Sequence, residues 1–239
     1  MKKIIVLVII LNVSNSLLGQ EIKRATNYLN MDVGVGSYRG SLSFSFLHNW
    51  QLGKNQKFGI GIGCRFTSFL GANLYYVTAP AKLTSGSTGP LIFFKENIIE
   101  NIDSLLVKSP QVNALNLMIN LDYRIAPKFV VGFNIDAIGF SFGGNKSANF
   151  MSGSTGQIIK AKPTSFNILL VSDNDRGSLN SELYLKYFFH EKWAIKTSLQ
   201  FLFTEYTTET KVQQYPEEND RFRNKSLMFS IGLSHKLSK

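Results

Sequence analysis

Eight charged side chains stand at alternate positions inside segments whose intervening residues are mostly apolar. A period of two places them on one face of extended strands. Charges of both signs on a shared, enclosed face can neutralise one another, whereas a lone buried charge is costly. We expect them to form a polar network that fills the lumen of a barrel; the alternative is a narrow path for ions or small solutes. These residues are Asp32, Arg65, Asp122, Arg124, Asp136, Glu182, Lys186 and Lys196.

The three histidines, His48, His190 and His235, are the candidates for acid–base chemistry. Hydrolysis by a serine nucleophile needs a histidine beside the serine and an acid that orients the imidazole. The predicted topology places all three near one end of the strands, away from any such pair. Neither histidine nor cysteine clusters at metal-ligand spacing. We therefore expect no enzymatic activity, no cofactor and no metal.

The first residues have the layout of a secretory signal peptide. Lys2 and Lys3 precede an apolar run from Ile4 to Leu11, and small residues follow near Gly19. The run is far shorter than the roughly 20 residues of a membrane-spanning helix. We expect residues 1–19 to be removed, which leaves residues 20–239 as one domain.

The formal net charge of +10 is spread over several segments and forms no single block. We therefore expect no nucleic-acid partner and consider outer-membrane lipid, including lipopolysaccharide, the more natural one. After the signal, no apolar stretch is long enough for a spanning helix. A mature chain that enters a membrane must then do so as a closed barrel.

About eight segments between residues 28 and 237 alternate apolar and polar residues. The clearest is 115–124, where Leu115, Leu117 and Ile119 alternate with asparagines and other polar residues. The polar face is rich in Gly, Ser and Asn, which suit a narrow lumen better than a water-exposed surface. We therefore expect the apolar face to meet lipid; a secreted soluble barrel of the lipocalin kind is the alternative.

The connections between these segments alternate in length. Tight turns are expected at Gly53 to Gln56, Ala126 to Lys128 and His190 to Lys192. At the other end, a turn at 38–40 is followed by long connections at 70–113, 144–177 and 207–224. This alternation is typical of outer-membrane barrels and places both termini in the periplasm.

The alternating segments and their connections resemble the small outer-membrane β-barrel proteins, the family that includes the OmpA barrel and the OmpX and OmpW types. The resemblance covers residues 28–237 and rests on pattern, with no specific motif. One departure is the end of the chain, His235 to Lys239, which lacks a terminal aromatic residue. The resemblance implies an all-β fold: an eight-stranded antiparallel up-and-down transmembrane barrel with long extracellular loops.

Such a barrel in the cell outer membrane is expected to have a structural or surface-binding role without catalysis. The alternative is a narrow pore or gated channel for small or apolar solutes. Its loops would contact a surface partner or an apolar small molecule.

The longest connection contains apolar residues at helical spacing. They predict an amphipathic helix from Glu96 to Val107 that packs over the barrel mouth. The alternative is a lid over a path for an apolar ligand, as in barrels that resemble the OmpW type. The apolar stripe consists of Ile98, Ile99, Ile102, Leu105 and Leu106.

Overall fold

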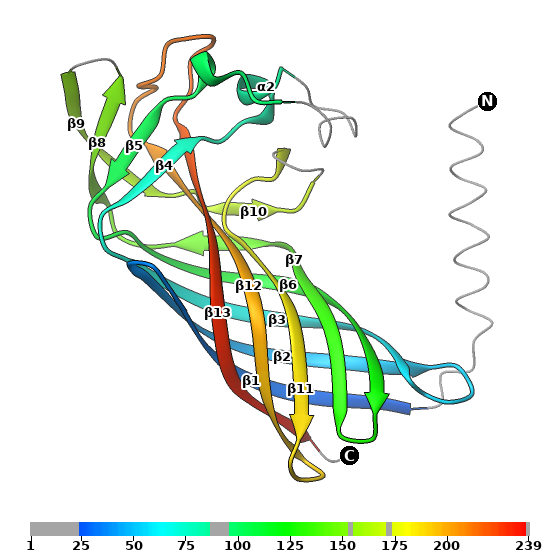
Figure 1. Ribbon diagram of the computed structural model, residues 1–239. Coiled ribbons are helices and arrows are strands. Elements are labelled where there is room, and N and C mark those ends of the chain that lie inside the picture. Colours follow the sequence, from blue (N-terminus) through cyan, green and yellow to red (C-terminus); the bar gives the residue numbers. More distant parts are fainter. Residues whose placement is uncertain (1–23, 87–95, 153–154, 171–173, 238–239) are drawn as a thin grey trace, which may run out of the picture.

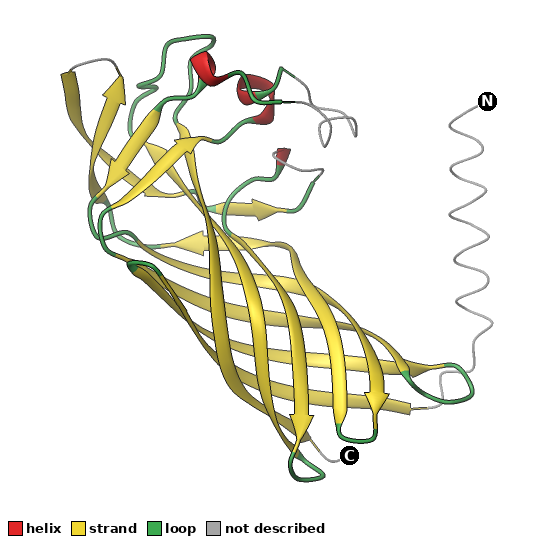
Figure 2. Ribbon diagram, viewed as in Figure 1, coloured by secondary structure: helices red, strands yellow, loops and turns green. Residues whose placement is uncertain are grey.

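The computed structural model describes residues 24–86, 96–152, 155–170 and 174–237. The predicted signal peptide lies outside these residues. Within them, thirteen strands form a single sheet in which every pairing is antiparallel (Figures 1 and 2).

The long strands of the sheet pair into a closed ring. Each pairs with the next, and the last pairs back with the first, so the ring has no free edge along most of its length. The eight strands are β1 (Arg24–Gly36), β2 (Arg39–Leu52), β3 (Phe58–Gly71), β6 (Gln111–Ala126), β7 (Phe129–Phe142), β11 (Leu179–Phe188), β12 (Trp193–Thr208) and β13 (Arg221–Leu237).

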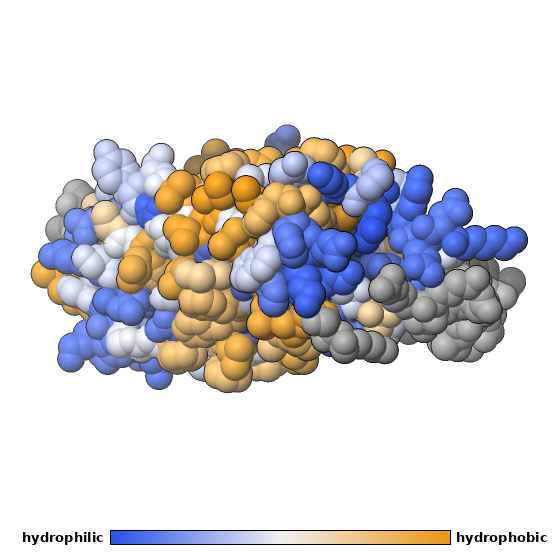
Figure 3. Space-filling view, turned by 90° about the horizontal axis from the view of Figure 1, so that it is seen from below, coloured by the Kyte–Doolittle hydropathy of each residue, from blue (hydrophilic) through white to orange (hydrophobic). Residues whose placement is uncertain are grey.

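The two faces of the ring differ as the alternation predicts. On β1, Asn30 and Asp32 are buried, whereas Leu29, Met31 and Val33 are between 46% and 48% exposed. The same division recurs around the ring, so mostly polar side chains fill the inside, together with a small cluster of Tyr28, Leu47 and Met118, and apolar ones cover the outside. In Figure 3, apolar side chains gather in the middle of the molecule and mostly polar ones lie toward its ends.

Short turns join the strands at one end of the ring. The connections β2–β3, β6–β7 and β11–β12 are all brief, and the end of β13 lies beside them (Figure 1). The β1–β2 turn at the opposite end is also tight, with Tyr38 at a φ of 58°. These connections agree with the predicted pattern of turns.

The long connections differ from the expected loops because they contain further strands. These are β4 (Leu74–Thr78), β5 (Ser104–Val107), β8 (Lys146–Ser152), β9 (Thr155–Pro163) and β10 (Phe166–Ile168). Two short helical turns accompany them, α2 (Ala81–Thr84) and η2 (Ile99–Asn101). The segment β10 pairs with the outer part of β7, beyond the residues of β7 that pair with β11. It therefore extends the wall of the barrel there.

Four of these strands close a second, smaller ring with the outer parts of β12 and β13. Its order is β12, β9, β8, β5, β4 and β13. It stands beyond the mouth of the large ring (Figure 1). In contrast to the large ring, its interior is apolar.

Aromatic contacts organise the core of this six-stranded ring. The rings of Tyr76 and Tyr206 meet edge-on with centroids 5.2 Å apart, and those of Phe150 and Phe222 lie 5.9 Å apart. Burial raises the pKa of the Tyr76 hydroxyl, which stays protonated and shares a hydrogen bond with Thr204. The interior thus changes from polar to apolar along the same two strands.

The predicted helix from Glu96 to Val107 is wrong. Only the three residues of η2 are helical there, and the segment continues as β5 between β4 and β8. Leu105 is fully buried in the six-stranded ring, whereas Ile99 is 83% exposed. The apolar residues therefore share no single face, and the pairing of β5 with distant strands overrides their helical spacing.

The segment that was expected to form a lid is partly a strand of the six-stranded ring. Leu105 belongs to a wall of the six-stranded ring, and Leu106 is half-buried on the same strand. Ile98 and Ile102 flank η2 and lie outside that strand. A deletion of this segment would therefore break a strand ladder and would not simply open a lid.

Ile119→Arg tests the outward apolar face, because Ile119 lies near the middle of β6 with its side chain 43% exposed. We expect the barrel in lipid vesicles to lose about 2–4 kcal/mol of unfolding free energy, as for arginine at a bilayer midplane. Urea titration followed by tryptophan fluorescence measures the loss. Ile99→Arg, the same change beyond the ring, is the control and should leave stability nearly unchanged. Equal effects of the two changes would show that the face of Ile119 does not meet lipid.

Candidate functional site

Six of the eight charged residues singled out in the sequence are almost fully buried inside the large ring. They come from five strands, and their alternation with outward apolar residues directs them inward. Three are acids and three are bases, so their formal charges cancel. The six are Asp32, Arg65, Asp136, Glu182, Lys186 and Lys196.

Arg65 of β3 reaches across the lumen to β7 and β11. Its Nε and Nη2 atoms donate to Asp136 Oδ1 at 3.0 and 2.6 Å. Nη1 donates to Asn134 Oδ1 at 2.7 Å and lies 3.3 Å from Glu182 Oε2. Nη2 also donates to the carbonyl of Asn180 at 2.5 Å. The planar guanidinium thus satisfies several groups on two strands at once.

Lys196 of β12 extends the network to the far side of the ring. Its ammonium donates to Glu182 Oε2 at 2.5 Å and to Asp32 Oδ2 at 2.9 Å. Glu182 therefore lies between two cations. The resulting chain of charges crosses the lumen in the order Asp136, Arg65, Glu182, Lys196 and Asp32.

Neutral groups add hydrogen bonds around these charges, although Asp32 Oδ1 and Glu182 Oε1 are buried without a partner. The amide of Asn116 donates to Asp136 Oδ2 at 2.8 Å, and the backbone N–H of Asn180 donates to the same oxygen at 3.0 Å. The amide of Asn134 donates to Glu182 at 3.0 Å. Buried ion pairs are tolerated when such hydrogen bonds offset the loss of hydration.

A second layer lies nearer the tight turns. The ammonium of Lys186 is 4.5 Å from the centroid of the Tyr28 ring and donates to Asn30 at 3.2 Å. The Tyr184 hydroxyl donates to Asn120 at 2.8 Å. The lumen is therefore filled at more than one level.

Asp122 and Arg124 lie at the edge of this layer and are half-buried. Asp122 accepts hydrogen bonds from Asn49 at 2.8 Å and from Asn120 at 3.1 Å. Arg124 lines an open groove at the barrel end together with Lys128 and Phe188. The structure thus brings Asp122 into the lumen network and leaves Arg124 at its mouth.

Glycines on the lumen face give room for side chains that cross it. A Cβ at Gly132 would lie 2.4 Å from the ring of Tyr184, and one at Gly34 would lie 2.3 Å from the amide oxygen of Gln200. That oxygen accepts a hydrogen bond from Ser41 on β2 at 2.8 Å. These two glycines thus leave space for the large side chains of Tyr184 on the neighbouring strand β11 and of Gln200 on β12.

The histidines lie at the end with the tight turns. His48 contacts Trp50 with ring centroids 4.6 Å apart, and His235 contacts Trp193 at 4.2 Å. His190 is exposed in the β11–β12 turn. Among the described residues, no group of three or more His, Cys, Asp or Glu side chains could hold a metal ion.

Sequence reasoning missed a buried ionic cluster at the outer end of β12 and β13. Glu205 is fully buried and accepts from Arg221 at 2.8 and 3.1 Å and from Arg223 at 2.8 Å. Both arginines also donate to the carbonyl of Asp175. One feature of the sequence could have indicated this cluster. Arg221 and Arg223 alternate just before the apolar residues of the last strand, although the composition around them favours a loop.

No helix in the described part of the chain has the length and hydropathy needed to cross a membrane.

No protein-family model and no curated protein matches the chain. Its fold is similar to several solved structures. Neisserial surface protein A matches at 7% identity and a TM-score of 0.37, over 89% of this chain and 96% of that one. The outer membrane protein Ail of Yersinia pestis, in a phospholipid bilayer nanodisc, matches at 8% and 0.39, over 90% and 100%.

A major outer membrane protein of Thermus thermophilus matches at 10% identity and a TM-score of 0.36, over 89% of this chain and 99% of that one. All three of these solved structures are of outer-membrane or surface proteins. The inner and outer faces of the ring follow from this chain's own strand register and burial.

Arg65→Ala tests the chain of charges, because it leaves Asp136 buried without its main cation and takes one of two cations from Glu182. We expect a loss of about 3–5 kcal/mol in unfolding free energy, as when one partner of a buried pair is removed. Urea titration in lipid vesicles measures it. The control is Lys82→Ala, which breaks the exposed Lys82–Glu217 pair and should cost about 1 kcal/mol or less. If both changes lower the unfolding free energy equally, the buried lumen charges stabilise the barrel no more than an exposed ion pair does.

Proposed function

We propose that the protein is an integral outer-membrane β-barrel with a filled lumen and a structural or surface-binding role, without catalysis. The eight-stranded ring is the transmembrane part, and the six-stranded ring is the extracellular part that meets the surroundings. The observation that carries the proposal is the chain of ion pairs from Asp136 to Asp32 inside a ring whose outer face is apolar.

The dimensions of the ring support a membrane-spanning role. Its strands contain 10 to 17 residues, and a tilted strand needs about 9–11 to cross a bilayer. A closed ring also satisfies the backbone hydrogen bonds that lipid cannot. In water, an apolar belt on every strand would favour aggregation.

The same faces weigh against a soluble barrel of the lipocalin kind. Such a barrel keeps its apolar residues inside, around a ligand cavity. Here the inside holds Arg65, Glu182 and Lys196, and leucines and phenylalanines cover the outside.

The pore alternative requires an open path along the lumen. In the structure, Arg65, Tyr184 and Gln200 each form a hydrogen bond with a strand that is not a direct neighbour of their own in the ring. The apolar core of the six-stranded ring also includes Phe69 and Val112 at the outer ends of β3 and β6. A channel through the lumen would therefore need several side chains to move together.

Conductance separates these alternatives. The mature protein, refolded and inserted into a planar lipid bilayer, should show no steady conductance above that of the bilayer. The heat-dependent gel mobility of the same sample verifies that the barrel is folded. Regular conductance steps from folded protein would favour the channel, whereas recovery of the native protein in a soluble periplasmic fraction would overturn the membrane proposal.

Labelling of intact cells tests the orientation. In a Cys64→Ser background, Tyr215→Cys lies in the exposed connection between β12 and β13, and Lys54→Cys lies in the β2–β3 turn. We expect a membrane-impermeant maleimide to label the first variant and to spare the second until the cells are lysed. The reverse result would place the six-stranded ring in the periplasm.

A further inference from the structure

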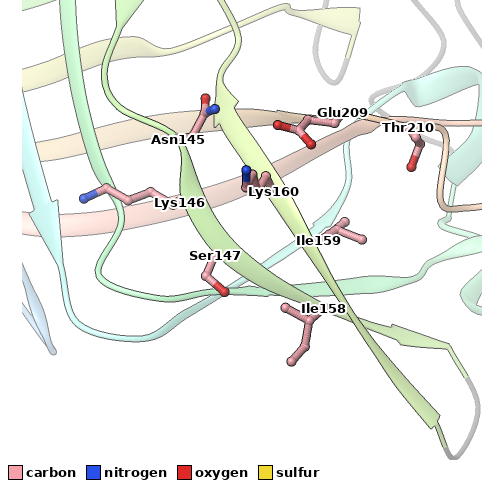
Figure 4. A pocket seen from close by; sticks show the side chains of 8 residues that line it. All are labelled: Asn145, Lys146, Ser147, Ile158, Ile159, Lys160, Glu209 and Thr210. Carbon is pink, nitrogen blue, oxygen red and sulfur yellow. The ribbon is translucent and has the colours of Figure 1, made fainter.

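A groove of about 550 Å³ lies on the outer surface of each ring. The one on the six-stranded ring lies at the base of the β8–β9 hairpin, where Lys146, Lys160 and Glu209 line it (Figure 4). The register of β8 and β9 directs the two lysine side chains to opposite faces of the hairpin, so this groove gathers no charge of one sign. The groove on the large ring is mostly apolar and has a simpler chemistry.

The apolar groove runs across the strands, between two rows of outward side chains. Cys64 lies beside Phe46 in one row, and Phe66 lies beside Phe44 in the next. Cys64 has the smallest side chain in either row, so the larger side chains around it form the walls. The first row consists of Trp193, His235, Leu29, Phe46 and Cys64, and the second consists of Leu233, Met31, Phe44, Phe66 and Leu115.

The stagger of the strands inclines this groove to the membrane plane. Trp193 is the first residue of β12, beside the tight turns, whereas Cys64 lies near the middle of β3 and Leu115 near the outer start of β6. Neighbouring strands lie about 4.8 Å apart, so the groove is roughly 24 Å long from β12 to β6. With a strand tilt of about 45° it rises roughly 17 Å, close to the ~15 Å of one leaflet of the hydrocarbon core.

Polar side chains border the groove at its lower end. The rings of Trp193 and His235 lie there with centroids 4.2 Å apart, and both can present an N–H to a phosphate oxygen. Asn30 and Ser45 also border the groove, but their side chains bond each other at 2.9 Å on the lumen face. The groove thus has one polar end and an apolar length, as a phospholipid has.

We infer that this groove binds one phospholipid of the periplasmic leaflet, with its phosphate at Trp193 and His235 and one acyl chain along Cys64. The inference rests on the proposed function, which places the tight turns in the periplasm and the outer face in lipid. A second copy of the chain fits this face less well. A symmetric dimer would set the hollow against itself, and the void left there would lose packing contacts. A flexible acyl chain can follow the hollow, which is continuous with the lipid-facing belt.

The two tryptophans of the chain allow a site-specific test. Trp50 and Trp193 both lie beside tight turns, but only Trp193 lines the groove. Trp50→Phe leaves Trp193 as the only tryptophan, and Trp193→Phe leaves Trp50 as the control. The full mature chain, refolded in neutral detergent micelles, is titrated with phosphatidylethanolamine whose acyl chains have bromine atoms near the headgroup, because bromine quenches tryptophan fluorescence on contact.

We expect the quenching of Trp193 to saturate at a single lipid per chain, and that of Trp50 to rise only in proportion to the lipid in the micelle. In the Trp50→Phe background, Cys64→Phe fills the groove and should abolish the saturable quenching. Its control, Ser181→Phe, adds the same ring to the outward face of β11, outside the groove, and should leave the quenching unchanged. A brominated fatty-acid methyl ester, which has no phosphate, should not saturate the site at the same concentrations.

Equal quenching of the two tryptophans, or saturable quenching that persists in Cys64→Phe, would overturn the inference. So would an equal loss in Ser181→Phe, or saturation by the methyl ester at the same concentrations. Native mass spectrometry counts the protein copies in each micelle, and a dimer with unquenched Trp193 would assign the groove to a second copy instead. Heat-dependent gel mobility and insertion into vesicles are measured on the same variants. A failure to insert would contradict the proposed function, whereas insertion without saturable quenching would contradict only this inference.

Discussion

The buried chain of charges inside the large ring constrains the register of its strands. Each acid or base there is stable only while its partner on another strand stays in place, because an unpaired charge in the interior is costly. Glu182 on β11 needs both Arg65 on β3 and Lys196 on β12. A slip of one residue in any of these strands would direct the charge outward and an apolar side chain inward. The ion pairs and the alternation therefore select the same arrangement.

Strands β12 and β13 belong to both rings and extend from the large ring into the small one. Along β12, the inward side chains change from Lys196 and Gln200 to Leu202 and Tyr206. The polar interior therefore gives way to an apolar one without a break in the strand. Glu205, Arg221 and Arg223 add a buried ionic cluster at this junction. A continuous ladder and a packed core thus join the outer ring to the barrel.

The sequence predicted the features that depend on local alternation. The faces of the long strands, the tight turns and the inward charges follow from a period of two. The sequence did not predict β5, because Leu105 and Val107 become buried only through pairing with β4 and β8, which lie far along the chain. The Glu205 cluster was missed for the same reason, since Arg223 meets Glu205 only in the register of β12 and β13. Arg124 was placed on the correct face, but its position near a strand end puts it at the mouth.

The balance of acids and bases in the lumen affects whether the barrel could conduct ions. The six nearly fully buried charges comprise three acids and three bases. Ion pathways commonly carry rings of one charge sign that attract and select the permeating ion. A balanced interior offers no such selection, and its side chains already bind one another across the lumen. Contacts such as those of Arg65 with Asp136, Tyr184 with Asn120 and Gln200 with Ser41 occupy the space that a permeating ion would need. The balance of charge and the filling of the lumen therefore both weigh against an ion path through the large ring.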